Sequence, residues 1–256
     1  MIDPNKFDRI IAYGCSWTAG DELLDHEILG VSFAECNRLK KEFRFPNIFN
    51  KKYNIIEPCE INRNASWAGQ LAKLLGKPFE NRARGGSCMD HIYFNVYMDM
   101  LNGSITDRDL VLVGLTSPNR FFQFIHKKPH SVLLGYPPHW KDEATLRLFT
   151  TICEDNFVVF SYFRTVAALN ALKDRINIRI QPASGGMSPN SEAFLYDIED
   201  VKEYALDVWE KCDTMLLAED FLKMEPENLE VCQYQHQPVE SHIALAKRIY
   251  NECVIK

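Results

Sequence analysis

The stretch that decides the fold reads RIIAYGCSWTAG over residues 9–20. Its first part, Arg9 to Gly14, is a short apolar run of the kind that forms a buried strand. Ser16 follows almost at once, and the carboxyl end of a strand is where parallel sheets place their functional sites. Backbone N–H groups at the start of a following helix would stabilise an oxyanion there. Taken alone, the pattern also fits an ordinary turn or a helix N-cap.

Further short apolar runs alternate with longer helical patterns along the chain, which is typical of β-α-β units and a parallel sheet. The other predicted strands are Phe79 to Ala83, Leu110 to Leu115 and Ile176 to Gln181. The predicted helices are Trp67 to Leu75, Phe157 to Lys173, Ser191 to Cys212 and Val239 to Cys253. Gly76 and Pro78 end the first of these helices. The pattern predicts an α/β fold with helices packed against a parallel sheet.

Length and charge limit the function classes. With 256 residues, of which 46% are hydrophobic, residues 1–256 are expected to form a single domain. The net charge of -6 gives no basic surface for nucleic acid or for an anionic membrane. The N-terminus lacks the pattern of a secretory signal, and no run of about 18 apolar residues is present to span a membrane. We expect a soluble protein without nucleic-acid or membrane partners.

Two stretches show no clear pattern, namely Asp21 to Ala65 and Phe121 to Glu143. Both are long, and the second contains Pro129, Pro137 and Pro138. Connections of this length in a compact domain are usually functional loops or lids. We expect long loops at 21–65 and 121–143, with the first folding over Ser16.

The eight cysteines are dispersed and form no C-x-x-C pair, so a zinc knuckle or a thioredoxin-like motif is not indicated. Free thiols in a reducing compartment are expected instead. Cys15 and Cys88 fall inside the motifs, and this leaves a reactive cysteine as a reserve hypothesis.

The first motif, with Gly14, Ser16, Thr18 and Gly20, resembles the Gly-Asp-Ser-x-Thr-x-Gly block of the SGNH (GDSL-like) hydrolase family. Cys15 stands in place of the aspartate of this block. The resulting Gly-Cys-Ser-aromatic-Thr form resembles a subgroup that is common among phage and environmental members of the family. The resemblance implies a three-layer α/β/α, flavodoxin-like fold with a central parallel sheet of about five strands. It also implies a cytoplasmic or virion-associated protein.

Two more blocks resemble the family. Residues 81–87, which read NRARGGS, resemble its strand end and glycine turn, and the resemblance implies that Gly86 offers its backbone N–H to the oxyanion. The segment 236–246 resembles the family's histidine block, with His236, His242 and Ala246 at the family spacing. His236 precedes the last helix and is expected to be the base. His242 shares a helix face with Ala246 and is expected to be a packed side chain.

Two positions depart from the family pattern. Gln233 stands where the family has its acid, and Thr116 stands where the third block has its asparagine. The hydroxyl of Thr116 is the expected replacement donor in the oxyanion hole, and Asn119 is an alternative. Gln233 is the candidate to orient the histidine.

The resemblance implies a serine esterase in which Ser16 attacks an acyl carbonyl, His236 takes its proton, and the N–H groups of Ser16 and Gly86 hold the oxyanion. The substrate is expected to be a small-molecule, short-acyl or carbohydrate ester, with no cofactor and no metal. The alternative is a catalytically degenerate SGNH domain that binds a ligand or a partner. A flavodoxin-like nucleotide binder is disfavoured, because no glycine-rich phosphate loop with a lysine follows the first strand.

Overall fold

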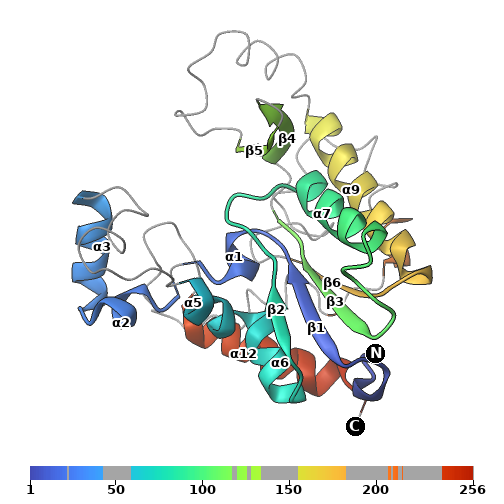
Figure 1. The fold of residues 1–256 in the computed structure, drawn as a ribbon. Coiled ribbons are helices and arrows are strands. Elements are labelled where there is room, and N and C mark those ends of the chain that lie inside the picture. The colour runs from blue at the N-terminus through green and yellow to red at the C-terminus, as the bar shows by residue number, and fades with distance from the viewer. Residues whose placement is uncertain are drawn as a thin grey trace.

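The structure is a computed structural model (Figure 1). It describes residues 1–21, 23–42, 59–116, 120–125, 128–133, 155–182, 207–208, 210–212, 215 and 238–255. Within this part of the chain, helices surround a twisted parallel sheet, and the two termini lie together at one end (Figure 1).

The sheet has the strand order β2-β1-β3-β6, and every pair of neighbours is parallel. Its strands are β1 (Arg9–Tyr13), β2 (Phe79–Asn81), β3 (Asp109–Gly114) and β6 (Asn177–Gln181). All of them were predicted, with bounds that shift by one or two residues. The described sheet therefore has four strands, against the expected number of about five.

Alternating side chains of the strands divide the core into two layers. Ile11, Tyr13 and Val111 pack on one face of the sheet with residues of α7 (Met89–Leu101) and α9 (Asp155–Ala171). On the other face, the intervening residues of the same strands pack with α6 (Trp67–Leu75) and α12 (Val239–Cys253). The fold is thus the predicted three-layer α/β/α arrangement, with the sheet between two layers of helices (Figure 1).

Local signals set the bounds of α6. The Ser66 hydroxyl accepts a hydrogen bond of 3.3 Å from the Gly69 N–H, which caps the start of the helix. Gly76 ends it in the left-handed conformation with a φ of 62°. The prediction for this helix is confirmed, as is the one for α12, which begins directly after Pro238. The helix expected at Phe157 to Lys173 is α9, followed by the 3-10 turn η3 (Leu172–Asp174).

The stretches expected as long loops contain regular structure. Within 21–65 lie α2 (Asp25–Leu29), α3 (Phe33–Glu42) and α5 (Cys59–Ala65). The second stretch overlaps an antiparallel hairpin of β4 (Arg120–Ile125) and β5 (Lys128–Leu133). The expectation of loops throughout is therefore corrected for both stretches. Most of the helix expected at Ser191 to Cys212 lies outside the described residues.

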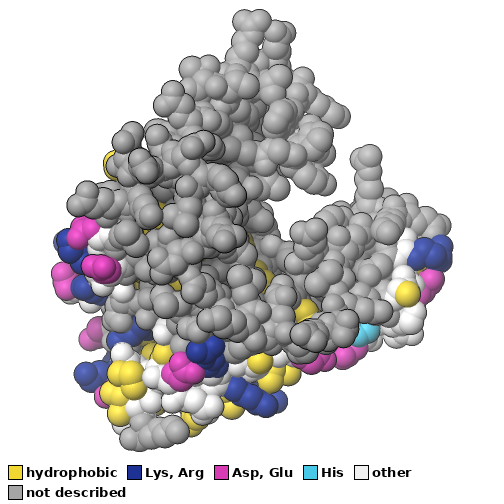
Figure 2. Space-filling model, turned by 180° about the vertical axis from the view of Figure 1, so that it is seen from behind, with side chains coloured by type: hydrophobic (Ala, Val, Ile, Leu, Met, Phe, Trp, Pro, Cys, Tyr) yellow, Lys and Arg dark blue, Asp and Glu magenta, His cyan; other side chains and the backbone are white. Residues whose placement is uncertain are grey.

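None of the helices in the described ranges combines the length and the apolar character needed to cross a lipid bilayer. On the face opposite to that of Figure 1, the coloured Lys and Arg side chains are interspersed with Asp and Glu side chains rather than gathered by sign (Figure 2).

Candidate active site

Ser16 is the first residue of α1 (Ser16–Ala19), a short helix that follows β1. Cys15 precedes it in an extended conformation, so the chain turns sharply between strand and helix. The first N–H groups of a helix have no intrahelical acceptor, so the N–H of Ser16 has none within α1. The residue is 8% exposed. A serine in this position combines a hydroxyl with a backbone donor, as a nucleophile next to an oxyanion hole requires.

The position of Thr18 explains why glycine occupies the ends of two neighbouring strands. Its side chain is fully buried, and its hydroxyl oxygen occupies the space that a Cβ would need at either Gly14 or Gly114. Gly14 directly follows β1, and Gly114 is the last residue of the neighbouring strand β3. The two strand ends therefore approach each other across Thr18, and a larger residue at either glycine would displace α1.

The glycine turn after β2 lies directly beside Ser16. The N–H of Arg84 donates to the carbonyl of Gly14 over 3.1 Å, which ties the turn to the end of β1. A Cβ added at Gly85 would begin 3.9 Å from the Cβ of Ser16. Gly86 has a φ of 76°, a conformation that favours glycine. The structure thus brings the turn that contains Gly86 next to Ser16.

Asn81, the first residue of the second block, has a positioning role. Its Nδ2 donates to the carbonyl of Thr18 over 2.9 Å, and its Oδ1 accepts from the N–H of Ala83 over 3.0 Å. Both ends of this buried amide are used within the protein. Asn81 therefore joins the end of β2 to α1 and holds the glycine turn in register.

Thr116 follows the end of β3, the strand on the other side of β1. It is 1% exposed, and its N–H lies 3.5 Å from the sulfur of Met89. Its hydroxyl has no hydrogen-bond partner among the described residues. A buried hydroxyl without a partner costs about 1–3 kcal/mol of stability, so its retention favours a role for the group outside packing. The alternative donor, Asn119, lies outside the described residues.

His236 and Gln233 both lie outside the described residues, so the Ser16 and His236 pair remains a sequence prediction. His242 is fully buried, and its Nδ1 accepts a hydrogen bond of 2.9 Å from the N–H of Trp67. Its ring also lies 5.4 Å from that of Trp17. His242 is therefore a packed side chain that joins α12 to the start of α6, as its place on the helix predicted.

Asp21 is a residue near the site that the sequence reasoning missed. Its N–H donates to the carbonyl of Ser16 over 2.9 Å. One carboxylate oxygen occupies the space that a Cβ at Gly85 would need, so the group touches the glycine turn. Its sequence signal was its position directly after Gly20, the last residue of the first motif. The fold places a carboxylate beside the candidate nucleophile.

The cysteines within the motifs, Cys15 and Cys88, are buried and form no disulfide with a described residue. Cys15 is 5% exposed, and Cys88, which precedes α7, has no exposed surface. Reactive thiols need access to solvent and a cationic neighbour, so burial disfavours the reserve hypothesis of a catalytic cysteine. In the part of the chain that the structure describes, no three His, Cys, Asp or Glu side chains lie close enough to hold a metal ion.

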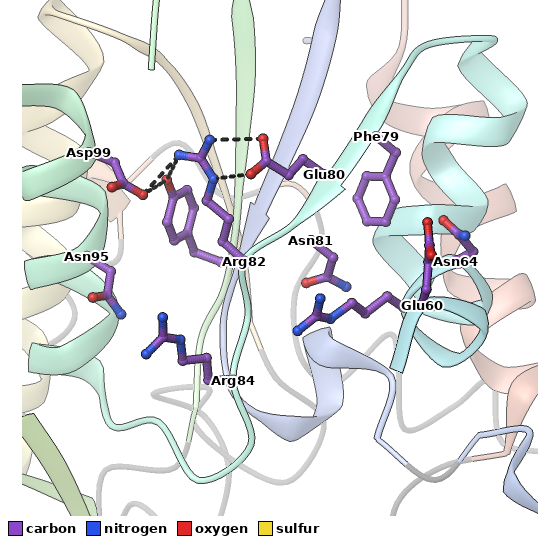
Figure 3. Close-up of a pocket in the computed structure, with 11 residues that line it drawn as sticks. Glu60, Asn64, Phe79, Glu80, Asn81, Arg82, Arg84, Asn95 and Asp99 are labelled. Atoms are coloured by element: carbon purple, nitrogen blue, oxygen red, sulfur yellow. Dashed lines mark hydrogen bonds and ion pairs between the residues drawn. The ribbon is translucent and has the colours of Figure 1, made fainter. Parts of the chain in front are cut away.

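A charged network lies beside the site at the edge strand β2 (Figure 3). Arg82 bonds to both oxygens of Glu80 over 2.7 and 2.9 Å, and also to Asp99 over 2.9 Å. The hydrogen bonds from Arg82 lower the pKa of Glu80, and those to Glu80 raise the pKa of Arg82. The Tyr13 hydroxyl donates to Asp99 over 2.7 Å. Burial, and to a smaller degree this hydrogen bond, raises the pKa of Tyr13. The network thus places the guanidinium of Arg82 between the carboxylates of Glu80 and Asp99.

A scan against protein-family models finds no match for this chain, and no curated protein matches it in sequence. Among solved structures, it is similar to a carbohydrate esterase family 2 enzyme with a carbohydrate-binding domain from Corynascus thermopiles (Myceliophthora fergusii). The identity is 12% and the TM-score 0.48, over 96% of this chain and 66% of that chain.

Two further similar structures cover both chains nearly in full. One is a member of the lipolytic protein G-D-S-L family from Veillonella parvula, with 10% identity and a TM-score of 0.45 over 95% of this chain and 96% of that chain. The other is the psychrotrophic esterase EstA from Pseudoalteromonas sp., with 10% identity and a TM-score of 0.44 over 96% of each chain. The solved structures to which this chain is similar thus include esterases and G-D-S-L proteins, the family that its sequence motifs resemble.

Proposed function

We propose that this chain is a divergent SGNH hydrolase that cleaves a carboxylic ester through Ser16 and His236. The observation that carries the proposal is the meeting of three strand ends. Ser16 follows β1, the turn with Gly85 and Gly86 follows β2, and Thr116 follows β3. Because the strands are parallel neighbours, their carboxyl ends share one edge of the sheet.

The proposed reaction begins when His236 accepts the proton of the Ser16 hydroxyl and the serine oxygen attacks the acyl carbonyl. The carbonyl oxygen becomes an oxyanion, for which the N–H groups of Ser16 and Gly86 and the hydroxyl of Thr116 are the proposed donors. Collapse of this intermediate breaks the bond to the alcohol, which receives the proton from His236. Water, activated by His236, then attacks the acyl-enzyme and releases the acid and free Ser16.

The hydroxyl of Thr116 has no hydrogen-bond partner among the described residues, and this supports its place among the proposed donors. Preorganised donors stabilise the transition state because they need no reorganisation when the charge develops. A threonine hydroxyl supplies one such donor, as the amide of an asparagine does. The replacement of asparagine by Thr116 is therefore compatible with catalysis.

The proposed site is unusual because Gln233 stands where the family has the acid that stabilises the imidazolium. A glutamine side chain can accept a hydrogen bond from an imidazole N–H but carries no charge, and we propose that Gln233 or a backbone carbonyl orients His236. Asp21 is the described carboxylate that touches the glycine turn. In the serine proteases, replacing the acid by its amide lowers kcat by about 10⁴, so a site without any carboxylate would be slow.

We propose a short-acyl or carbohydrate ester as substrate. The chain shows no long apolar stretch of the kind that covers lipid-binding sites. The hollow next to the glycine turn has a largely polar and charged lining, in which Phe79 and Tyr13 are the aromatic members. A lining of this kind suits hydroxyl groups and short acyl chains better than a long hydrocarbon.

The test is covalent labelling with a fluorophosphonate, followed by identification of the modified peptide. Modification at Ser16 together with hydrolysis of p-nitrophenyl acetate is the expected result. A folded protein that is neither labelled nor active on short esters would contradict the proposal and favour the degenerate binding domain.

A further inference from the structure

A hollow of about 470 Å³ lies along the outer edge of β2, between α5 and α7 (Figure 3). Its volume lies in the range that small-molecule sites occupy. The residues that line it are Tyr13, Glu60, Arg63, Asn64, Phe79, Glu80, Asn81, Arg82, Arg84, Asn95 and Asp99. All of them belong to the described part of the chain. The hollow also adjoins the candidate active site, because Arg84 begins the glycine turn and its N–H bonds to Gly14.

The charges at one end of the hollow are already balanced. Glu80 pairs with Arg82 and, over 3.2 Å, with Arg9, while Asp99 pairs with Arg82 and accepts from Tyr13. These contacts use the acidic groups of the network within the protein. A ligand that bound there would have to break ion pairs, so this end forms a wall of the hollow.

Arg63 and Arg84 differ from that network. Both line the hollow, yet neither guanidinium makes an ion pair or a hydrogen bond with a described residue. Arg63 is half-buried on α5, and Arg84 is exposed at the start of the glycine turn. Glu60 lies one turn before Arg63 on α5, but the two form no salt bridge. The hollow therefore contains two guanidinium groups with open donors.

The remaining lining supplies neutral contacts. Asn64 stands on the α5 side and Asn95 on the α7 side, with Phe79 above Asn81 between them (Figure 3). The side-chain amides of Asn64 and Asn95 make no hydrogen bond with the described residues. Amides bind hydroxyl groups, and an aromatic ring packs against the apolar face of a sugar ring. Guanidinium groups bind carboxylates and phosphates through paired N–H donors.

From this combination we propose that Arg63 and Arg84 bind the carboxylate or phosphate of a polyhydroxylated substrate, so that the ester cleaved at Ser16 is one of an acidic sugar. The assignment of the hollow to the substrate rests on the proposed esterase function. Binding of the anionic group itself is independent of catalysis. Arg84 connects the two sites through its backbone bond to Gly14.

The first experiment measures binding without turnover. Inorganic phosphate, galacturonate and neutral galactose are titrated separately into the protein by calorimetry or by NMR. Wild type is expected to bind at least one anion and to bind galactose at least about tenfold more weakly, since it lacks the charge-assisted bonds. Stronger binding of galacturonate than of phosphate identifies a carboxylate ligand, and the reverse identifies a phosphate. Equal binding of galactose and the anions overturns the proposal.

The matched variants are Arg63→Gln with Arg84→Gln, and Arg164→Gln as control. Arg164 is an exposed arginine of α9, and its Nη2 lies 3.7 Å from Oδ1 of Asp90. The double variant should lose at least about tenfold in anion affinity while its melting temperature stays that of wild type, because neither guanidinium makes a hydrogen bond or an ion pair with a described residue. The control should keep wild-type affinity. Retained affinity in the double variant overturns the proposal.

The second experiment compares kcat/KM for acetylated galacturonate with that for acetylated galactose. Wild type should prefer the acidic ester by about tenfold or more, and the double variant should lose this preference. If wild type binds the anion but hydrolyses no ester, the esterase proposal fails and the anion site stands. If it hydrolyses both esters equally well, the anionic substrate is excluded and the esterase proposal stands.

Discussion

The Cβ of Ser16 lies 3.9 Å from the point at which a side chain on Gly85 would begin. The two residues follow different strands, β1 and β2, which are parallel neighbours in the sheet. Bonds from Arg82 to Ala12 and from Arg84 to Gly14 continue the pairing beyond the end of β2. The glycine turn is therefore held in van der Waals contact with the candidate nucleophile by backbone hydrogen bonds.

Replacement of Ser16 by alanine is expected to abolish ester hydrolysis and fluorophosphonate labelling. The change removes one hydroxyl from a small side chain, so the free energy of unfolding should change by about 1 kcal/mol or less. Rates on p-nitrophenyl acetate and a urea denaturation curve check both parts. Ser104→Ala, an exposed serine in the turn before β3, is the control and should keep full activity. Substantial turnover by Ser16→Ala would show that Ser16 is not the nucleophile.

Gly86→Ala is expected to reduce kcat more than it reduces stability. The residue has a φ of 76°, in open space, so the added methyl group costs about 1 kcal/mol through backbone strain alone. Gly103 has a φ of 71°, also in open space, and Gly103→Ala should cost about the same. Melting temperatures should therefore match, while kcat falls by about tenfold or more only at Gly86, where the oxyanion donor moves. Equal kcat values would remove Gly86 from the proposed oxyanion hole.

The hydroxyl of Thr116 is expected to matter for chemistry and not for stability. Thr116→Val keeps the shape of the side chain and removes a buried hydroxyl without a described partner, so the protein should be as stable as wild type or more stable. Loss of one oxyanion donor should lower kcat by about 10²-fold. Thr116→Ser retains the donor and should retain most of the activity. A fully active Thr116→Val would limit the oxyanion hole to backbone donors.

The two histidines of the last block should respond differently to alanine. His236→Ala is expected to abolish turnover as Ser16→Ala does, with little loss of stability. His242→Ala removes the acceptor of the Trp67 N–H and leaves a buried cavity, so it should destabilise by about 3 kcal/mol. The folded fraction of His242→Ala should remain active. Denaturation curves and rates per folded molecule separate the two effects, and the opposite outcome would exchange the roles of the histidines.

Gln233→Asp is expected to raise kcat by about tenfold or more, because a carboxylate stabilises the imidazolium that forms on His236. The variant is compared with wild type on p-nitrophenyl acetate across the pH range. A new carboxylate also raises the pKa of the histidine, so the acidic limb of the kcat/KM profile should move to higher pH.

Asp21→Asn tests the alternative, in which the carboxylate of Asp21 already stabilises the imidazolium. If Asp21 already supplies the charge, its amide should lower kcat and shift the acidic limb to lower pH, and Gln233→Asp should bring no gain. That result would assign the missing acid to Asp21.

Much of the fold followed from the sequence alone, because its signals are local. The strands appear as short apolar runs whose successive side chains, such as Ile10 and Ile11, are buried on opposite faces of the sheet. Ser66 and Gly76 mark the ends of α6 because a cap needs only neighbouring residues. Ser16 and the glycine turn were recognisable for the same reason, since each lies within a few residues of a strand end.

Tertiary structure decided what depends on contacts between distant segments. The helices within 21–65 lacked a clear pattern, and they are held by contacts such as the 2.7 Å bond from Asn62 to Asp25. The place of Asp21 against Gly85 arises because β1 and β2 are paired, and no periodicity in the sequence encodes that pairing. Arg63 and Arg84 likewise meet at one hollow only because α5 packs beside β2. Residue spacing specifies which side of a helix or strand faces the core, whereas the packing of these elements determines which polar groups come together.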